Sequence, residues 1–303
     1  MPRLQGRRDP GARGAGADVV IAHAGPCAST VGLLGDTSAR DYSFKLRLFN
    51  SFAESELRQA IACLELRPGM RVLDAGCGTG EALAWLLSEV EPHGTVVGVD
   101  LSAPHVAAAR RGRSPTIRVL QADLLEMPLA AGSFDAIWCV NVINHLRDPL
   151  LGVKRLAALL VPDGRLAVGQ SSFLPDMYFA WDSRLERLTN EAVRAYYRDR
   201  YCLDERDLAG TRSLVGLLTR AGLRRVRART YIIERTAPLD AAAENYLLEG
   251  IFKGTWGERL RPYLSTEDYA ELSRLCDPKD SQFALRRPDF HLLQTFSVVV
   301  GES

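Results

Sequence analysis

Strand-like and helix-like segments alternate along the chain from Met70 to about Ser172. Short buried runs such as MRVLDAG, TVVGVDLS and SFDAIWCVNV are separated by segments with a helical period, such as EALAWLLSEV. Strands that alternate with helices form a parallel sheet covered on both faces, because right-handed crossovers place the helices there. The sequence therefore predicts an α/β fold with a doubly wound sheet, whose ligands bind beyond the carboxyl ends of the strands.

Two long segments interrupt this alternation and predict helical caps over the sheet. The first covers residues 173–208 and is rich in aromatic residues, and the second covers residues 237–288, before a final strand-like run. Loops of such length are usually lids or binding elements. We also expect a disordered leader at residues 1–40, two lid helices at residues 41–66 and a main domain over residues 67–303.

The composition argues against several classes of partner. The chain has 303 residues, and its 38 Lys and Arg against 37 Asp and Glu give a net charge near +1, which supplies no electrostatic footprint for nucleic acid or an anionic membrane. No stretch approaches the roughly 18 apolar residues that cross a bilayer. The six cysteines include no C-x-x-C pair, so no metal site is expected. We expect a cytoplasmic protein, monomeric or homodimeric, with a small-molecule partner.

The glycine-rich run VLDAGCGTGEA follows the first strand and predicts a ligand-binding turn. Three alternating glycines would only weaken a purely structural connection. They are Gly76, Gly78 and Gly80, and Glu81 stands where the nicotinamide fingerprint G-x-G-x-x-G requires its third glycine. The spacing of these glycines therefore does not match the dinucleotide-binding pattern. No G-x-x-x-x-G-K-[ST] run is present to hold polyphosphate.

Two acids further along the chain fit a nucleoside ligand. Asp100 ends the second strand, where a carboxylate can accept hydrogen bonds from both hydroxyls of a ribose. Such an acid serves NAD and S-adenosylmethionine alike. Asp123 follows the third strand, where a carboxylate can accept from an exocyclic adenine amine while the backbone N–H of Leu124 reaches a ring nitrogen. A base could thereby be bound without a phosphate site.

Five runs of the sequence, in this order, resemble the class I S-adenosylmethionine-dependent methyltransferases. The runs are VLDAGCGTG, VVGVDLS, QADLLEMPL, SFDAIWCVNVINHL and LVPDGRLAV. Within that family they resemble the small-molecule branch that includes ubiquinone/menaquinone C-methyltransferase-like proteins. The resemblance implies a Rossmann-like sheet with strand order 3-2-1-4-5-7-6, an antiparallel last strand at Phe290–Gly301, and S-adenosyl-L-methionine as the cofactor. More loosely, the N-terminal helices and second cap resemble actinomycete natural-product methyltransferases, some of which methylate indole carbons.

The resemblance also implies which residues bind the cofactor. The glycine loop lines its methionine part, Asp100 binds the ribose, and Asp123 with Leu124 holds the adenine, while Asn141 lies beside the methionine amino group. The full set implied in this way is Asp74, Ala75, Gly76, Gly78, Thr79, Gly80, Asp100, Leu101, Asp123, Leu124 and Asn141.

Three side chains are candidates for catalysis on the acceptor side. His145 follows the fourth strand, where an imidazole could take a proton from the acceptor, or could instead pack or orient it. His291 is the other candidate base, because the last strand is expected to start at the carboxyl edge of the sheet; the alternative is packing under the cap. Tyr42 could touch the cofactor's carboxylate or the acceptor, or serve only the core of an amphipathic helix.

The large apolar side chains of the caps favour an apolar or aromatic acceptor, because so many rings leave some to face a pocket. They are Phe173, Met177, Tyr178, Phe179, Trp181, Tyr196, Tyr197, Tyr246, Phe252 and Trp256. No Lys-Glu or metal constellation typical of catechol-type oxygen methylation is recognisable. The sequence therefore favours carbon or nitrogen of a specialised metabolite, for example an indole-type acceptor. A small-molecule O-methyltransferase, a nicotinamide oxidoreductase and a non-catalytic S-adenosylmethionine-binding protein remain as alternatives.

Overall fold

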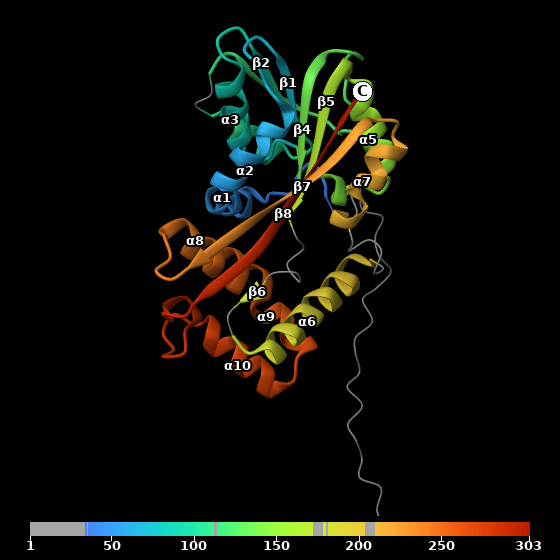
Figure 1. Ribbon diagram of the computed structural model, residues 1–303. Coiled ribbons are helices and arrows are strands. Elements are labelled where there is room, and N and C mark those ends of the chain that lie inside the picture. Colours follow the sequence, from blue (N-terminus) through green and yellow to red (C-terminus); the bar gives the residue numbers. More distant parts are fainter. Residues whose placement is uncertain (1–33, 35, 112–113, 172–177, 180, 204–209) are drawn as a thin grey trace, which may run out of the picture.

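A mixed sheet runs through the whole molecule (Figure 1). The computed structural model describes residues 34, 36–111, 114–171, 178–179, 181–203 and 210–303, and the structural statements below concern these residues. The strands are β1 (Arg71–Ala75), β2 (Thr95–Asp100), β3 (Ile117–Gln121), β4 (Phe134–Val140), β5 (Leu160–Ser171), β6 (Tyr178–Phe179), β7 (Arg224–Thr236) and β8 (His291–Glu302).

The order of the strands in the sheet confirms the predicted topology. The order is β3-β2-β1-β4-β5-β8, with β7 paired to β8, and β8 runs antiparallel to both β5 and β7. The sixth and seventh predicted strands are thus β7 and β8, and the last one starts one residue later than expected. A short strand that was not predicted, β6, pairs with Leu292 and Leu293 of β8.

Each face of the sheet carries its own hydrophobic core, because successive side chains of a strand point to opposite faces. Val72 of β1 packs on the face covered by α3 (Glu81–Val90) and α4 (Ala103–Arg110). Its neighbour Leu73 packs on the face covered by α5 (Pro149–Ala158) and α7 (Gly210–Arg220). Both faces of the parallel part are therefore covered, as the alternation of strands and helices predicts.

The helices of the caps lie past the carboxyl ends of the parallel strands, at the lower end of the view in Figure 1. The segment at residues 173–208 contains β6 and α6 (Ser183–Tyr201). The segment at residues 237–288 contains α8 (Ala241–Asn245), the π-helix η5 (Tyr246–Trp256), α9 (Gly257–Leu260) and α10 (Thr266–Cys276). β7 and β8 reach into this region, so the caps are attached to the longest strands of the sheet.

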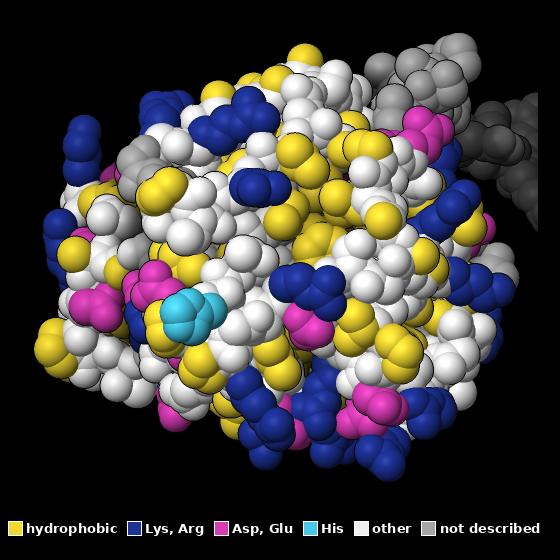
Figure 2. Space-filling view, turned by 90° about the horizontal axis from the view of Figure 1, so that it is seen from above, with side chains coloured by type: hydrophobic (Ala, Val, Ile, Leu, Met, Phe, Trp, Pro, Cys, Tyr) yellow, Lys and Arg dark blue, Asp and Glu magenta, His cyan; other side chains and the backbone are white. Residues whose placement is uncertain are grey.

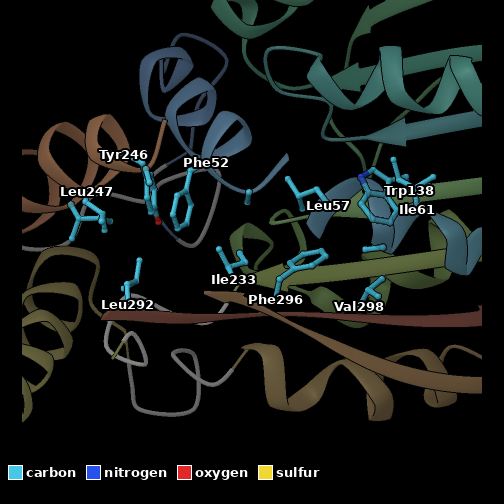
Figure 3. Close-up of a cluster of buried hydrophobic side chains, with 14 of the residues drawn as sticks. Phe52, Leu57, Ile61, Trp138, Ile233, Tyr246, Leu247, Leu292, Phe296 and Val298 are labelled. Atoms are coloured by element: carbon cyan, nitrogen blue, oxygen red, sulfur yellow. The ribbon is translucent and has the colours of Figure 1, made fainter. Parts of the chain in front are cut away.

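One of the two cores continues from the sheet into the caps (Figure 3). Phe52 ends α1 (Ser43–Phe52), which is followed by α2 (Glu54–Ile61), and its ring stacks on that of Tyr246 with centroids 4.3 Å apart. Leu292 and Phe296 of β8, both fully buried, belong to the same cluster. The helices before β1 are therefore packed between the sheet and the second cap.

The face away from the caps has a mixed surface. Figure 2 shows Lys and Arg side chains spread over this face with Asp and Glu between them, and hydrophobic side chains near its centre. In the described part of the chain, no helix is long and apolar enough to cross a membrane.

Candidate active site

A cavity of about 300 Å³ lies where the loops after β1, β2, β3 and β4 meet at the carboxyl edge of the sheet. Eight of the residues implied to bind a cofactor line this pocket: Asp74, Gly76, Gly78, Asp100, Leu101, Asp123, Leu124 and Asn141. The pocket is also lined by Phe49 of α1 and by Tyr42, the residue just before this helix. Segments far apart in the sequence thus contribute to one site.

The loop after β1 requires glycine for conformational and steric reasons. Gly76, Gly78 and Gly80 all have positive φ angles, of 82°, 52° and 86°, where a side chain is strained. A Cβ on Gly76 would lie 2.2 Å from a methyl carbon of Val142. The backbone of this loop can therefore approach a ligand closely, and α3 begins directly after Gly80.

Asp100 is held in place by three donors. Its Oδ2 accepts from the backbone N–H of Gly78 at 2.8 Å, and its Oδ1 accepts from the N–H of Ser102 at 2.8 Å. His105 Nδ1 lies 3.1 Å from the same Oδ1. A carboxylate offers about four acceptor positions, so about one remains for a ligand hydroxyl without rearrangement.

The residues after β3 and β4 present different groups to the pocket. Asp123 Oδ1 accepts from the N–H of Leu125 at 2.8 Å, which fixes the carboxylate at the pocket wall. Asn141 has a φ of +56°, and its Oδ1 accepts from the backbone N–H and the hydroxyl of Ser171 at 2.8 and 3.1 Å. The Asn141 amide nitrogen is a donor, so the group best placed to accept from an ammonium is its backbone carbonyl.

Three members of the implied cofactor set lie outside the pocket lining. Ala75 is fully buried, Thr79 donates to Glu81 Oε2 at 2.6 Å, and Gly80 is the residue before α3. These three residues belong to the loop or to the elements beside it, but they do not line the pocket.

His145 is hydrogen-bonded to an acid that the sequence did not single out. Its Nδ1 lies 2.9 Å from Asp36 Oδ2, and the Tyr42 hydroxyl donates to Asp36 Oδ1 at 3.3 Å. All three residues line the pocket. Asp36 falls within the predicted leader, most of which lies outside the described residues, and no local pattern in the sequence marks it as a partner of His145.

The charges around Asp36 favour its ionised form. Burial raises the pKa of this carboxyl, but the hydrogen bond and charge of His145, together with Arg40 and Tyr42, outweigh burial and hold the pKa below its ordinary value. For Tyr42, burial and the nearby charge of Asp36 raise the pKa of the phenol far above its ordinary value. Tyr42 is therefore a hydrogen-bond donor at neutral pH rather than a base.

His291 does not reach the pocket, which corrects the expectation that the last strand begins at the carboxyl edge. Strand β5 pairs with β8 only from Phe296 to Glu302, so β8 starts about 16 Å beyond that edge at 3.3 Å per residue. His291 is 40% exposed there, and its Nε2 lies 2.8 Å from Glu234 Oε1. The amino end of β8 is paired with β7 and β6 and extends beyond the parallel strands.

The expectation that cap aromatics face the pocket is also not met in the described residues. Phe179, Trp181, Phe252 and Trp256 pack against one another, with ring centroids 4.4 to 6.3 Å apart. Phe173 and Met177 lie outside the described residues. The aromatic rings that line the pocket come from other elements: Tyr42, Phe49, Trp85 and Trp138. Phe49 could have been found from its spacing, since it lies two helical turns after Tyr42.

Comparison with known proteins finds similarity in the central part of the chain. Residues 72–164 match the profile of a family described as a methyltransferase domain. A demethylmenaquinone methyltransferase of Thermus thermophilus is 35% identical over 42% of this chain and 59% of its own length. A nocamycin O-methyltransferase of Saccharothrix syringae is 36% identical over 37% of this chain and 41% of its own length.

The remaining similarity is one of fold. The YcgJ protein of Bacillus subtilis superposes with a TM-score of 0.52 at 18% identity, over 82% of this chain and 98% of its own. The chain covers only 38%, 24%, 39% and 59% of the lengths of four curated relatives that it matches. The similarity to these relatives thus concerns the domain around the pocket. In the described part of the chain, no group of three or more His, Cys, Asp or Glu could hold a metal ion.

Proposed function

We propose that this chain is an enzyme that uses S-adenosyl-L-methionine to methylate a small molecule, and the match of residues 72–164 to a methyltransferase domain supports this. The observation that carries the proposal is the convergence of the glycine loop, Asp100 and Asp123 on one pocket. These groups suit a nucleoside that carries a short amino acid and no phosphate. The cofactor, when bound, supplies a methyl group activated by a positively charged sulfur.

Each part of the cofactor has residues that fit it. The free acceptor position of Asp100 suits a ribose hydroxyl, and the carboxylate of Asp123 suits the exocyclic amine of adenine. The backbone at Gly76 and Gly78 allows close approach of the methionine part, and the carbonyl of Asn141 suits its ammonium group. This assignment retains Asp100, Asp123 and Leu124 in the roles that the family resemblance implies.

The hydrogen bond between His145 and Asp36 orients a base on the acceptor side. A carboxylate only accepts hydrogen bonds, so Nδ1 of His145 carries the hydrogen in this pair and Nε2 is the basic nitrogen. Methyl transfer to a neutral acceptor releases one proton, which Nε2 can take. Because the transfer is a one-step displacement, alignment of acceptor, methyl and sulfur supplies most of the acceleration, worth up to about 7–11 kcal/mol.

For the acceptor we retain carbon or nitrogen of an apolar or aromatic metabolite, with an indole as the model compound. The rings of Phe49, Trp85 and Trp138 on the pocket wall support an apolar acceptor. A second candidate is methylation of a hydroxyl oxygen, and the His145–Asp36 pair favours it. A phenol must lose its proton as the bond to oxygen forms, so an oriented base helps it more than it helps an indole carbon or an amine.

The proposal is tested in two steps. Calorimetric titration of the full chain with S-adenosylhomocysteine should show binding, whereas binding of NADH without it would favour an oxidoreductase. Labelled-methyl transfer is then measured over matched indoles, phenols and amines, with His145→Gln and, as the matched control, His291→Gln. Loss of phenol methylation in the first variant alone would select the hydroxyl acceptor. Cofactor binding with no transfer to any compound would indicate a non-catalytic binding protein.

A further inference from the structure

His105 is a buried residue whose two ring nitrogens contact different parts of the molecule. It lies in the first turn of α4, lines the pocket and is 5% exposed. Its Nδ1 lies 3.1 Å from Asp100 Oδ1, and its Nε2 lies 2.9 Å from the backbone nitrogen of Tyr42. The ring therefore lies between the carboxylate that suits a ribose and the residue just before α1.

These two contacts fix the position of the hydrogen on the ring of His105. A peptide N–H can only donate, so Nε2 must accept the hydrogen bond from Tyr42. Nδ1 then carries the hydrogen and donates it to the carboxylate of Asp100. A side chain with only a donor or only an acceptor could make one of these bonds but not both.

Two further hydrogen bonds hold the N-terminal segment, residues 36–42, on the start of α4. The Ser102 hydroxyl donates to the backbone carbonyl of Arg40 at 2.7 Å. The backbone N–H of Ala103 donates to the carbonyl of Ser38 at 2.8 Å. The segment is therefore attached to the same turn of the protein that presents the carboxylate at the end of β2.

The N-terminal segment also forms part of the pocket wall. Asp36, Thr37, Arg40 and Tyr42 all line the pocket. Asp36 is hydrogen-bonded to Nδ1 of His145 and accepts from the Tyr42 hydroxyl. If the segment left α4, the pocket would lose this part of its wall and His145 would lose the partner that orients it.

We propose that His105 is a positioning residue that couples cofactor binding to the contact of the N-terminal segment with the pocket. The inference rests on the proposed function, because it assigns Asp100 to the ribose of the cofactor. A ribose bound to Asp100 fixes the carboxylate and, through Nδ1, the ring of His105, so that Nε2 stays in place for the N–H of Tyr42. The segment then holds Asp36 against His145. Because coupling is reciprocal, the attached segment in turn favours the bound cofactor.

Nitrogen NMR of the full chain labelled with isotopic histidine tests the bonds of His105 without any ligand. At neutral pH we expect a ring with hydrogen on Nδ1 and none on Nε2, and the signal is assigned by its loss in His105→Asn. A ring with hydrogen on Nε2, alone or together with Nδ1, cannot accept from Tyr42 and would overturn the proposal.

Two variants separate the two bonds of His105. Asn places its amide nitrogen close to the position of Nδ1, so His105→Asn keeps a donor for Asp100 and loses the acceptor for Tyr42. Gln places its amide oxygen close to the position of Nε2, so His105→Gln keeps the acceptor and loses the donor. His93→Asn is the matched control, because His93 is exposed in the turn between α3 and β2 and lies outside the pocket lining.

Hydrogen exchange of the peptide that covers the N-terminal segment measures its attachment. In the native chain and in His93→Asn, saturation with S-adenosylhomocysteine should slow this exchange about fivefold or more, the scale of one hydrogen bond. In His105→Asn the peptide should exchange fast with and without the ligand. In His105→Gln it should exchange as in the free native chain, and the ligand should slow it much less. Calorimetry verifies that the ligand is bound in each case.

The outcomes distinguish this inference from the proposed function. If the ligand slowed exchange as much in both His105 variants as in the native chain, it would act on the segment by direct contact, and the coupling would be wrong. Binding of S-adenosylhomocysteine to the native chain without slower exchange would also overturn the coupling alone. Failure of the native chain to bind S-adenosylhomocysteine would contradict the proposed function, and the coupling with it.

Discussion

The two sides of the pocket are built in different ways. On the cofactor side, Asp100 ends a parallel strand, and Gly76, Gly78 and Asp123 lie within three residues of a strand end, so the sheet itself places them. On the acceptor side, Asp36 and His145 are far apart in the sequence, and they meet only through the packing of the N-terminal segment. The first side depends on the backbone and on topology, and the second on individual side-chain contacts.

Because of this difference, we expect substitutions in the two regions to have different effects on stability and on cofactor binding. A change in the caps should alter stability without altering affinity for S-adenosylhomocysteine, whereas a change in the strand-end loops should weaken that affinity.

The largest effect is expected from Trp256→Ala in the second cap. Trp256 is 2% exposed and packs against Phe179, Trp181 and Phe252, so the cavity should lower the free energy of unfolding by about 3–5 kcal/mol. Urea unfolding measures this cost, and calorimetry should show unchanged affinity for S-adenosylhomocysteine. Trp256→Phe is the milder control, since the indole N–H has no partner among the described residues. A tenfold loss of cofactor affinity in Trp256→Ala would break the separation of the two sides.

Gly76→Ala tests the backbone of the cofactor side. The residue has a φ of +82°, and its new Cβ would meet Val142 at 2.2 Å, so strain and overpacking together should cost about 2–4 kcal/mol of stability. Affinity for S-adenosylhomocysteine should fall as well. Gly216→Ala is the control, because nothing lies within 4 Å of a Cβ on this exposed helical glycine, and it should be neutral or stabilise by about 0.5–1 kcal/mol. Equal behaviour of the two variants would show that the loop tolerates a side chain.

Asp100→Ala tests a side chain on the cofactor side. Leaving a ribose hydroxyl unpaired in a closed site should weaken affinity for S-adenosylhomocysteine by about 1–3 kcal/mol. Asp135→Ala removes an acid that instead pairs with Arg71 and lies outside the pocket lining, so its affinity should match that of the native chain. Unchanged calorimetric affinity in Asp100→Ala would contradict the assignment.

The same contrast explains how far the sequence could be interpreted. The strand order followed from the alternation of strands and helices together with the family resemblance, and Asp100 and Asp123 could be placed because strand ends meet at one edge. His291 was misplaced because sequence does not reveal how far a strand extends past its neighbours. β8 runs on from Phe296 to His291 without β5 beside it, and nothing in the local pattern marks that point.

Contacts between side chains far apart in the chain could not be predicted from the sequence for a related reason. The pairing of Asp36 with His145 depends on how the N-terminal segment packs against the sheet. The hydrophobic pattern of α1 shows that it has a buried face but not which element covers it. The cap aromatics show the same limit, since their number predicted that some would face the pocket, and whether any did depended on tertiary packing.

The smallest effect is expected from the Asp36–His145 pair, and a double-mutant cycle isolates it. Asp36→Ala, His145→Ala and the double variant should give a coupling of about 1 kcal/mol in the free energy of unfolding at neutral pH, because the bond is charge-assisted but partly exposed. The pKa of Asp36 is lowered in the folded protein, so its carboxylate stabilises above the ordinary value of 3.8 and this contribution is lost as pH falls through the folded pKa, below 3.8. Urea unfolding from pH 7 downward should therefore show a coupling that persists to about pH 4 and then declines. A coupling that is absent at neutral pH would mean that the N-terminal segment does not hold His145, and the acceptor side would lose its oriented base.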